Sequence, residues 1–305
     1  MHGPMASDTV AFVKMQGAGN DFVVVDNRDY GFSGAELSVA AEAWCSRRYG
    51  VGADGLLALA PPRSSAADYR MGYWNADGSR ATMCGNGARC LFRFARCRGV
   101  GGGSALAFET DAGLYRAVQP GSAPDTVRLF VPDVTDVRPQ FQLEGPVPDA
   151  IRTLTFVHSG TEHLVATVDD LAAAKVTKWG RQLRHDAGVQ PAGANVNFLE
   201  LGPGRGVRVR TYEKGVEAET PACGTGVLAA AVVAERTRSA STARAVPVRT
   251  RGGDLRVGHA PTDRGEERYL EGPAVVVFRG KVQPPSASPR TASARRGDAS
   301  RRGRD

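Results

Sequence analysis

Two stretches of the sequence decide the fold: Tyr73-Trp-Asn-Ala-Asp-Gly-Ser-Arg-Ala-Thr-Met-Cys84-Gly-Asn-Gly87 and Tyr212-Glu-Lys-Gly-Val-Glu-Ala-Glu-Thr-Pro-Ala-Cys223-Gly-Thr-Gly226. In both, a Cys-Gly-x-Gly motif begins eleven residues after the tyrosine, and the two copies lie 139 residues apart. Three further matches keep almost the same spacing: Thr110-Asp-Ala-Gly113 with Thr250-Arg-Gly-Gly253 at 140 residues, Val131-Pro132 with Gly272-Pro273 at 141, and Phe22–Asp26 with Leu164–Asp169 at about 142. Four matches in order at nearly constant spacing predict an internal duplication.

A repeat of this length has the size of a domain and is much too long for a solenoid. We therefore expect two tandem domains, residues 9–122 and 123–273. Each copy has one helix signal, directly after its Cys-Gly-x-Gly, and Val227–Ala234 in the second is apolar on every face, so this helix must be enclosed. The expected fold class is α+β, with two pseudo-symmetric domains in which a barrel-like β-sheet wraps around a central helix. Short β-rich runs between turn residues predict strands at Val10–Lys14, Phe22–Asp26, Val127–Val131, Val207–Tyr212 and Val275–Arg279.

The composition is that of a globular protein, with 42% hydrophobic and 23% charged residues. No stretch approaches the ~20 apolar residues that a membrane span requires, and the N-terminus lacks a secretory signal pattern, so we expect a cytoplasmic protein that binds no membrane. Residues 283–305 carry six arginines and two aspartates but no large apolar residue. We expect this basic tail and residues 1–8 to be disordered, and the tail to be a solvated appendage with no specific nucleic-acid partner.

The five cysteines contain no Cys-x-x-Cys pair and no spacing typical of a metal site, so we predict neither a metal ion nor a disulfide scaffold. Cys45, Cys90 and Cys97 are interpreted as small buried hydrophobic residues. Core packing is the alternative interpretation for Cys84 and Cys223 as well. Their equivalence in the duplication argues against it.

Each of these two cysteines lies where the chain enters a helix. The first N–H groups of a helix have no internal partner and carry partial positive charge, so they bind a carboxylate and lower the pKa of an adjacent thiol. Two such helix starts facing each other would place a thiol on each side of an α-carbon. Inversion of that carbon requires a base on one face and an acid on the other, with the roles exchanged in reverse. The pattern predicts a cofactor-independent amino-acid epimerase with no pyridoxal site.

Three motifs carry a resemblance to a known family: Gln16-Gly-Ala-Gly-Asn20-Asp-Phe22, Asn75-Ala-Asp-Gly-Ser leading to Met83-Cys84-Gly85-Asn86-Gly87, and Tyr212-Glu213-Lys214-Gly215 leading to Ala222-Cys223-Gly224-Thr225-Gly226. Through them, residues 8–282 resemble the diaminopimelate epimerase family, which interconverts the LL and meso isomers in lysine and peptidoglycan biosynthesis. The resemblance implies that a final strand at residues 274–282 completes the first domain. It also implies that Cys84 and Cys223 are the acid–base pair.

The resemblance assigns roles to further residues. Backbone donors that hold the reacting carboxylate would come from Gly85, Asn86, Gly224 and Thr225. His163 and Glu213 match residues that tune the thiol pKa values, although His163 alone would be interpreted as an ordinary surface or hydrogen-bonded histidine. The matching substrate ligands are Asn20, Asn75, Thr161, Asn197, Glu213 and Lys214.

Two departures from the family pattern affect the expected substrate. This chain has Thr161-Glu162-His163 in place of Asn-Pro-His, and Lys214 in place of arginine, and the resemblance implies that both altered positions contact the non-reacting end of the substrate. A lysine does not reproduce the bidentate grip of arginine on a carboxylate. The alternatives are therefore an epimerase of another amino acid, or a non-catalytic anion-binding or thiol-redox protein. The expected partner is a small amino-acid substrate, and the sequence leaves a homodimer open.

Overall fold

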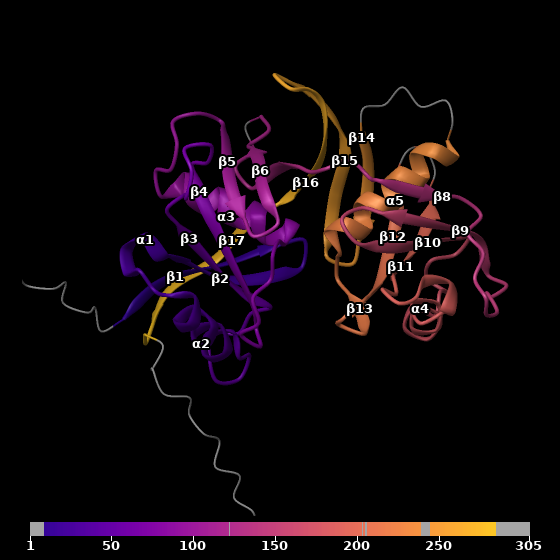
Figure 1. The fold of residues 1–305 in the computed structure, drawn as a ribbon, viewed down its shortest axis with the longest axis horizontal. Helices are drawn as coiled ribbons and strands as arrows, with labels where there is room; N and C mark the ends of the chain where they lie inside the picture. Colours follow the sequence, from indigo (N-terminus) through magenta and orange to yellow (C-terminus); the bar gives the residue numbers. More distant parts are fainter. Residues whose placement is uncertain (1–8, 122, 203, 205, 239–244, 285–305) are drawn as a thin grey trace, which may run out of the picture.

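The computed structural model describes residues 9–121, 123–202, 204, 206–238 and 245–284, which form two lobes of similar construction (Figure 1). In each lobe a curved sheet surrounds a central helix, α3 (Gly85–Cys97) in the first and α5 (Gly224–Thr237) in the second. The predicted α+β fold with two pseudo-symmetric domains is confirmed. The predictions of disorder for residues 1–8 and for the tail from residue 285 onward lie outside the described residues.

The two lobes repeat one strand order. In the first lobe, neighbouring strands follow the order β17 (Val275–Val282), β1 (Val10–Gly17), β2 (Asn20–Asp26), β3 (Gly55–Ala60), β4 (Tyr69–Asn75), β5 (Ala105–Thr110), β6 (Gly113–Val118) and β7 (Thr126–Phe130). In the second lobe the order is β8 (Asp136–Arg138), β9 (Ile151–His158), β10 (Glu162–Val168), β11 (Asn195–Leu201), β12 (Val207–Glu213), β14 (Ala245–Thr250), β15 (Gly253–Thr262) and β16 (Gly265–Pro273), with β13 (Ala218–Thr220) beside β12. The duplication predicted from sequence spacing is therefore present in the topology. The first lobe extends through β7, which pairs with β6, so the boundary expected between residues 122 and 123 falls too early.

One hairpin shows the repeat at atomic detail. Thr110 donates a hydrogen bond from its hydroxyl to the carbonyl oxygen of Gly113 at 2.9 Å, and Thr250 does the same to Gly253 at 2.9 Å. Both glycines have positive φ, at 124° and 132°, which a residue with a side chain adopts only under strain. The same turn chemistry therefore links β5 to β6 and β14 to β15.

The two sheets are joined at one place. β7 pairs with β16 in antiparallel register, with Leu129 opposite Leu270, so that the strands of both lobes form a continuous sheet. The chain then leaves β16 and crosses back, and β17 pairs with β1 (Figure 1). The central helices consequently start near this junction, and the two lobes share a boundary there.

The five predicted strands are all confirmed, with ends that shift by at most three residues. Both predicted helices are confirmed as well, and every residue of Val227–Ala234 is buried, as the all-round apolar pattern requires. Cys45 and Cys90 are buried, but Cys97 is exposed at the end of α3, so its interpretation as a buried residue was wrong. No helix in the described segments is long and apolar enough to span a membrane.

The sequence analysis missed the helices that cover the outside of the sheets. They are α1 (Asn27–Tyr30), α2 (Gly34–Cys45), α4 (Val176–Arg184) and the short 3-10 helix Ala187–Val189. A signal for α2 was present, because Ser33 and Glu36 form a capping box at its start. By contrast, α4 follows Lys175 with no side-chain cap, so its beginning carries no comparable signal.

Gly180 sets how closely α4 packs on the second sheet. A Cβ atom on Gly180 would lie 2.4 Å from Cβ of Tyr212 on β12. We predict that Gly180→Ala costs about 1–3 kcal/mol of unfolding free energy, because α4 must move away from the strand. Thermal unfolding measures this cost. Gly34→Ala is the matched control, since nothing lies within 4 Å of its Cβ position; equal melting temperatures for the two helix variants would contradict the prediction.

Candidate active site

The starts of α3 and α5 open into one cavity of about 470 Å³ between the lobes. Residues from both lobes line it, including Leu129 and Leu270 of the strand junction. It brings together ten of the residues that the sequence analysis selected, namely Asn20, Asn75, Cys84, Gly85, Asn86, Thr161, Glu213, Cys223, Gly224 and Thr225. His163, Asn197 and Lys214 are not among its lining residues.

The two thiols occupy equivalent positions in the two lobes. Cys84 is the N-cap residue of α3, and its sulfur accepts a hydrogen bond from the backbone N–H of Gly87 at 3.5 Å. Cys223 is the N-cap residue of α5, and its sulfur lies 3.4 Å from the hydroxyl of Thr225. In each case the first helical residue is a glycine, so no side chain covers the unpaired N–H groups of the first turn. The geometry therefore offers an anion two helix starts and two sulfur atoms.

Burial outweighs the helix effect on the thiols. The apolar surroundings raise the pKa of Cys223 to about 12, and the carboxylate of Glu213 acts in the same direction. Burial also raises the pKa of Cys84, against the lowering effects of the Gly87 and Asn86 N–H groups. The helix starts lower the thiol pKa values, as the sequence analysis expected, and the structure adds the loss of hydration inside the cavity, which raises them.

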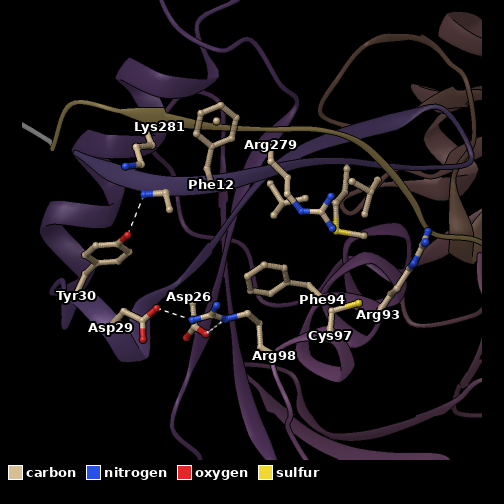
Figure 2. A pocket seen from close by; sticks show the side chains of 15 residues that line it. Phe12, Asp26, Asp29, Tyr30, Arg93, Phe94, Cys97, Arg98, Arg279 and Lys281 are labelled. Atoms are coloured by element: carbon tan, nitrogen blue, oxygen red, sulfur yellow. Dashed lines mark hydrogen bonds and ion pairs between the residues drawn. The ribbon is translucent and has the colours of Figure 1, made fainter. Parts of the chain in front are cut away.

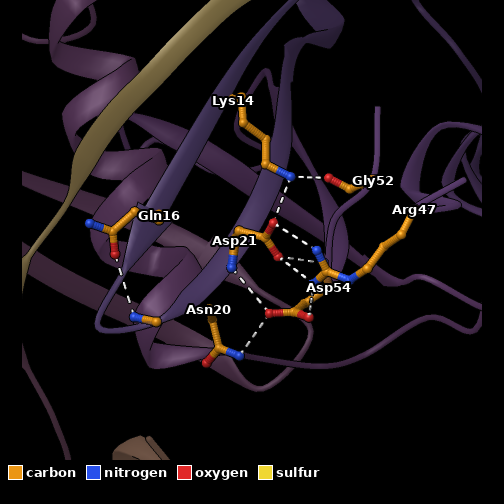
Figure 3. A network of polar contacts seen from close by, with 8 residues as sticks. Lys14, Gln16, Asn20, Asp21, Arg47, Gly52 and Asp54 are labelled. Atoms are coloured by element: carbon orange, nitrogen blue, oxygen red, sulfur yellow. Dashed lines mark hydrogen bonds and ion pairs between the residues drawn. The ribbon is translucent and has the colours of Figure 1, made fainter. Parts of the chain in front are cut away.

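A polar network fixes the start of α3. Asn86 donates from its amide nitrogen to Oδ1 of Asn20 at 2.5 Å, and Asn20 donates to Oδ2 of Asp54 at 3.1 Å. Asp54 in turn accepts from Arg47 at 2.7 Å (Figure 3). Asn20 and Asn86 both line the cavity, and their side-chain amides hold each other in place. The start of α3 is thus held by β2 and by the residue before β3, and not by the helix alone.

The same network extends to a buried lysine (Figure 3). Lys14 forms an ion pair with Asp21 at 2.7 Å and also donates to the carbonyl oxygen of Gly52. Although burial acts to raise it, hydrogen bonds from Arg47 and Lys14 bring the pKa of Asp21 down to about 2. Asp21 therefore stays charged, and the first lobe supports its helix start with a rigid group of charges.

The second lobe supports its helix start with neutral groups. Asn197 donates to Nδ1 of His163 at 3.0 Å and accepts from the Thr211 hydroxyl at 2.9 Å, and all three side chains are buried. Since Nδ1 accepts, the ring proton lies on Nε2. The amide oxygen of Asn197 also occupies the space where Gly226 lacks a side chain, because a Cβ atom there would lie 2.2 Å from it. These contacts occupy the Asn197 amide, so the geometry does not support the prediction that it binds substrate.

The altered positions contact one another, and Thr161 among them lines the cavity. Lys214 forms an ion pair with Oε2 of Glu162 at 2.7 Å, and the same oxygen accepts from the Thr161 hydroxyl at 3.0 Å. The Lys214 hydrogen bond lowers the pKa of Glu162 to about 2. The backbone N–H of Lys214 donates to Oδ1 of Asn195 at 2.9 Å. Lys214 and Glu162 are therefore coupled to each other.

The sequence analysis noted Glu162 only as a departure from the family pattern, without giving it a role, and it missed Asn195, which accepts a hydrogen bond from the Lys214 N–H. Asn195 begins β11, and Asp54 directly precedes the equivalent strand β3 in the first lobe. The two residues are 141 positions apart, so the repeat spacing was the signal that could have identified Asn195. It also missed the apolar wall formed by Tyr73, Met83, Tyr115, Leu129, Val131, Pro132, Leu228 and Leu270. These residues had no chemical signature, because apolar side chains are the ordinary content of strands and helices.

A second cavity, of about 530 Å³, lies between β1, β17 and the C-terminal half of α3 (Figure 2). None of the predicted site residues lines it. Arg98 at its edge is bound to Asp26 and Asp29, at 2.8 and 2.7 Å. The cavity between the lobes is therefore the candidate active site.

Comparison with known proteins assigns the family. The diaminopimelate epimerase family model matches residues 12–119 and 155–277. A diaminopimelate epimerase from Chlorobaculum tepidum is 41% identical over 270 residues, covering 88% of this chain and 99% of that protein. The chain belongs to the diaminopimelate epimerase family. Another family member, from Aquifex aeolicus, is 37% identical over 278 residues and covers 89% of this chain and 97% of that protein.

Solved structures of more distant proteins share the fold. A phenazine biosynthesis protein of the PhzF family from Bacillus anthracis has a TM-score of 0.66 at 15% identity, covering 90% of this chain and 99% of that one. A probable proline racemase from Agrobacterium radiobacter has a TM-score of 0.60 at 14% identity, covering 93% and 94%. At these identities the likeness extends to the architecture of two lobes and not further.

The buried histidine predicts a pH dependence of stability. Burial lowers the pKa of His163 to about 3, so the ring is neutral in the fold, whereas in the unfolded chain it takes up a proton below about pH 6.5. Above pH 6.5 the ring is neutral in both states, so His163 does not lower the unfolding free energy. As the pH falls from 6.5 towards 3, the unfolded chain gains a proton that the fold does not, and the unfolding free energy falls by about 1.4 kcal/mol per pH unit.

We therefore expect the wild-type protein to lose about 2 kcal/mol more unfolding free energy than His163→Gln between pH 7 and pH 5. Glutamine is neutral and retains an acceptor for Asn197. Urea unfolding at each pH measures the difference, and the remaining histidines cancel in the comparison. Parallel pH profiles for the two proteins would show that His163 is not buried in its neutral form.

Proposed function

We propose that the protein is a diaminopimelate epimerase that interconverts the LL and meso isomers with two thiols and no cofactor, acting in the cytoplasm on the free amino acid. The observation that carries this proposal is the placement of Cys84 and Cys223 at the starts of two equivalent helices that open into one cavity. Family membership supports the reaction. The shared cavity supports the assignment of the two acid–base groups.

Each turnover removes a proton from one face of the α-carbon and adds a proton to the opposite face. One cysteine, as the thiolate, removes the α-proton, while the other, as the thiol, delivers its proton to the opposite face. Negative charge builds on the substrate carboxylate as the first proton leaves. In this proposal the first-turn N–H groups at Gly85, Asn86, Gly224 and Thr225 stabilise that charge, and the apolar wall keeps water from competing for it.

The far end of the pocket matches a substrate that is an amino acid at both ends. Diaminopimelate carries an ammonium and a carboxylate at its non-reacting centre. Glu162 and Lys214 offer one charge of each sign beside Thr161, and about a quarter of each side chain is exposed, so both groups are reachable. The two departures from the family pattern therefore compensate each other: lysine replaces arginine as the cation, and glutamate supplies the acceptor for an ammonium group.

Isotope exchange tests the reaction. Incubated with LL-diaminopimelate in deuterated water, the wild-type protein is expected to form the meso isomer with deuterium at the α-carbon. Cys84→Ala and Cys223→Ala should each lower kcat by about 10²–10⁴-fold, because each removes one general acid or base. The exposed thiol of Cys97 provides the matched control, Cys97→Ala, which should keep full activity.

Two results would contradict the proposal. Full isomerisation by folded Cys84→Ala or Cys223→Ala would exclude the two-thiol mechanism. Exchange into a different amino acid, with none into diaminopimelate, would instead assign the enzyme to another substrate while leaving the mechanism intact.

The Glu162–Lys214 pair should determine the affinity for substrate more than the chemistry. We expect Lys214→Met to raise KM for diaminopimelate about tenfold or more, which corresponds to losing roughly 1.4 kcal/mol of binding, with a smaller change in kcat. Glu162→Gln should act in the same direction. Steady-state kinetics measure both, with Lys178→Met on the exposed face of α4 as the control. An unchanged KM in both pair variants would place the far end of the substrate elsewhere.

A further inference from the structure

Arg89 on α3 is a buried cation with only neutral partners. Its side chain is 0% exposed and is the largest fully buried side chain of the described residues. It donates to Oδ1 of Asn86 at 2.7 Å, to the carbonyl oxygen of Gly85 at 3.3 Å and to that of Pro273 at 3.3 Å. None of the ion pairs recorded for the described residues includes it. An unpaired buried charge costs several kcal/mol, so its retention calls for an explanation.

The fold makes room for this side chain. At Gly272, near the end of β16, a Cβ atom would lie 3.3 Å from Nε of Arg89 and 2.2 Å from Leu255. Any larger residue there would crowd the guanidinium. The buried position of Arg89 thus depends on the absence of a side chain at Gly272.

The equivalent place in the second lobe holds an apolar pair. Leu228 follows Cys223 by five residues, as Arg89 follows Cys84, and Val131 precedes its proline as Gly272 does. Leu228 and Val131 both line the cavity. One helix start is therefore accompanied by a buried cation, and the other by hydrocarbon.

A second difference in charge between the lobes lies at the ends of β4 and β12. Asn75 ends β4 and Glu213 ends β12, and both line the cavity. At the last residue of this strand, the lobe with the cation thus has a neutral amide, whereas the lobe without it has a carboxylate. Both differences favour negative charge at Cys84 over negative charge at Cys223.

From this geometry we infer that Arg89 is a positioning residue that places the resting negative charge of the thiol pair on Cys84, so that the enzyme starts with Cys84 as thiolate and Cys223 as thiol. The inference rests on the proposed function, in which these two sulfurs exchange protons with the substrate. Cys84 then gains the α-proton, Cys223 gives up its own, and the negative charge ends beside Glu213. The proton must return from Cys84 to Cys223 before the same direction can be repeated.

The groups around the thiols support this distribution of charge. Burial raises the pKa of both thiols, and the first N–H groups of α3 together with Arg89 act against it at Cys84. Glu213 is the strongest influence after burial in raising the pKa of Cys223, and it raises that of Cys84 more weakly. Tyr73 on β4 and Cys90 on α3 also interact with Cys84, and burial raises the pKa of both, so they remain neutral. The titratable and charged groups that face the two sulfurs are Arg89, Cys90, Tyr73, Glu213 and each other.

Alkylation of the substrate-free, full-length protein tests the inference without relying on turnover. Iodoacetamide reacts with thiolates, so the rate at each cysteine is followed by peptide mass spectrometry from pH 6 to 10. It yields a midpoint pH for a sulfur that titrates in this range and a lower limit of 10 for one that titrates above it. The midpoint separates charge from access, because access changes only the plateau rate. We expect a lower midpoint for Cys84 than for Cys223. Arg89→Met should raise the Cys84 midpoint by at least one pH unit, a tenfold fall in rate on the rising limb, whereas Arg89→Lys should keep it low.

Two controls accompany the variants. Arg93→Met removes an arginine from the same helix that is paired with Asp125 and borders the other cavity (Figure 2), and it should leave both midpoints unchanged. The exposed Cys97 reports within each sample whether reactivity has changed in general.

Three outcomes would overturn the inference: an unchanged Cys84 midpoint in folded Arg89→Met, an equal shift in Arg93→Met, or alkylation of Cys223 at the lower pH in the wild type. The last decides the question even if Arg89→Met fails to fold. Isomerisation of LL-diaminopimelate by the same wild-type preparation is measured in parallel, so that a failure of the proposed function is distinguished from a failure of the charge assignment.

Discussion

The antiparallel pairing of β7 with β16 positions everything else in the site. Leu129 and Leu270 lie opposite each other in this pair and are also equivalent in the repeat, so the pseudo-twofold axis passes between them. The same leucines lie against the first glycines of the central helices, because a Cβ atom on Gly85 or Gly224 would be 3.7 or 3.3 Å from a methyl group of Leu270. A single strand pair thereby brings two helix starts to one cavity. Without it, each lobe would hold half of an anion site.

On this symmetric backbone the side chains have diverged. Asp21 in the first lobe belongs to a group of charges, whereas His163, at the equivalent position 142 residues later, is neutral and hydrogen-bonded to Asn197. Both networks contact the first turn of a central helix, through Asn86 in the first lobe and against Gly226 in the second. A racemase that treated its two faces identically would have no use for such differences. An epimerase whose substrate has a second, non-reacting centre needs one lobe to recognise that centre.

The sequence predicted what repeats and what is chemically unusual. The spacing of the Cys-Gly-x-Gly motifs was enough to identify both central helices and both thiols, because two residues equivalent in a duplication share a structural position. The outer helix α4 was missed because its start has no cap, and the occupied amide of Asn197 was not foreseen because hydrogen-bond partners 14 and 34 residues away are set only by strand register. The net effect on thiol pKa depends on burial by both lobes. Such burial is a property of the assembled cavity and not of any local pattern.

The return of β17 to the first lobe has a consequence for the order of folding. β17 is the last strand of the described residues, yet it forms an edge of the first sheet by pairing with β1. During synthesis the first lobe therefore emerges with the hydrogen-bonding edge of β1 uncovered, and it stays incomplete until the second lobe has been made. The two lobes are thus not independent folding units, even though they share one strand order. The active site requires both lobes, and the first lobe in turn receives its edge strand only after the second lobe has been synthesised.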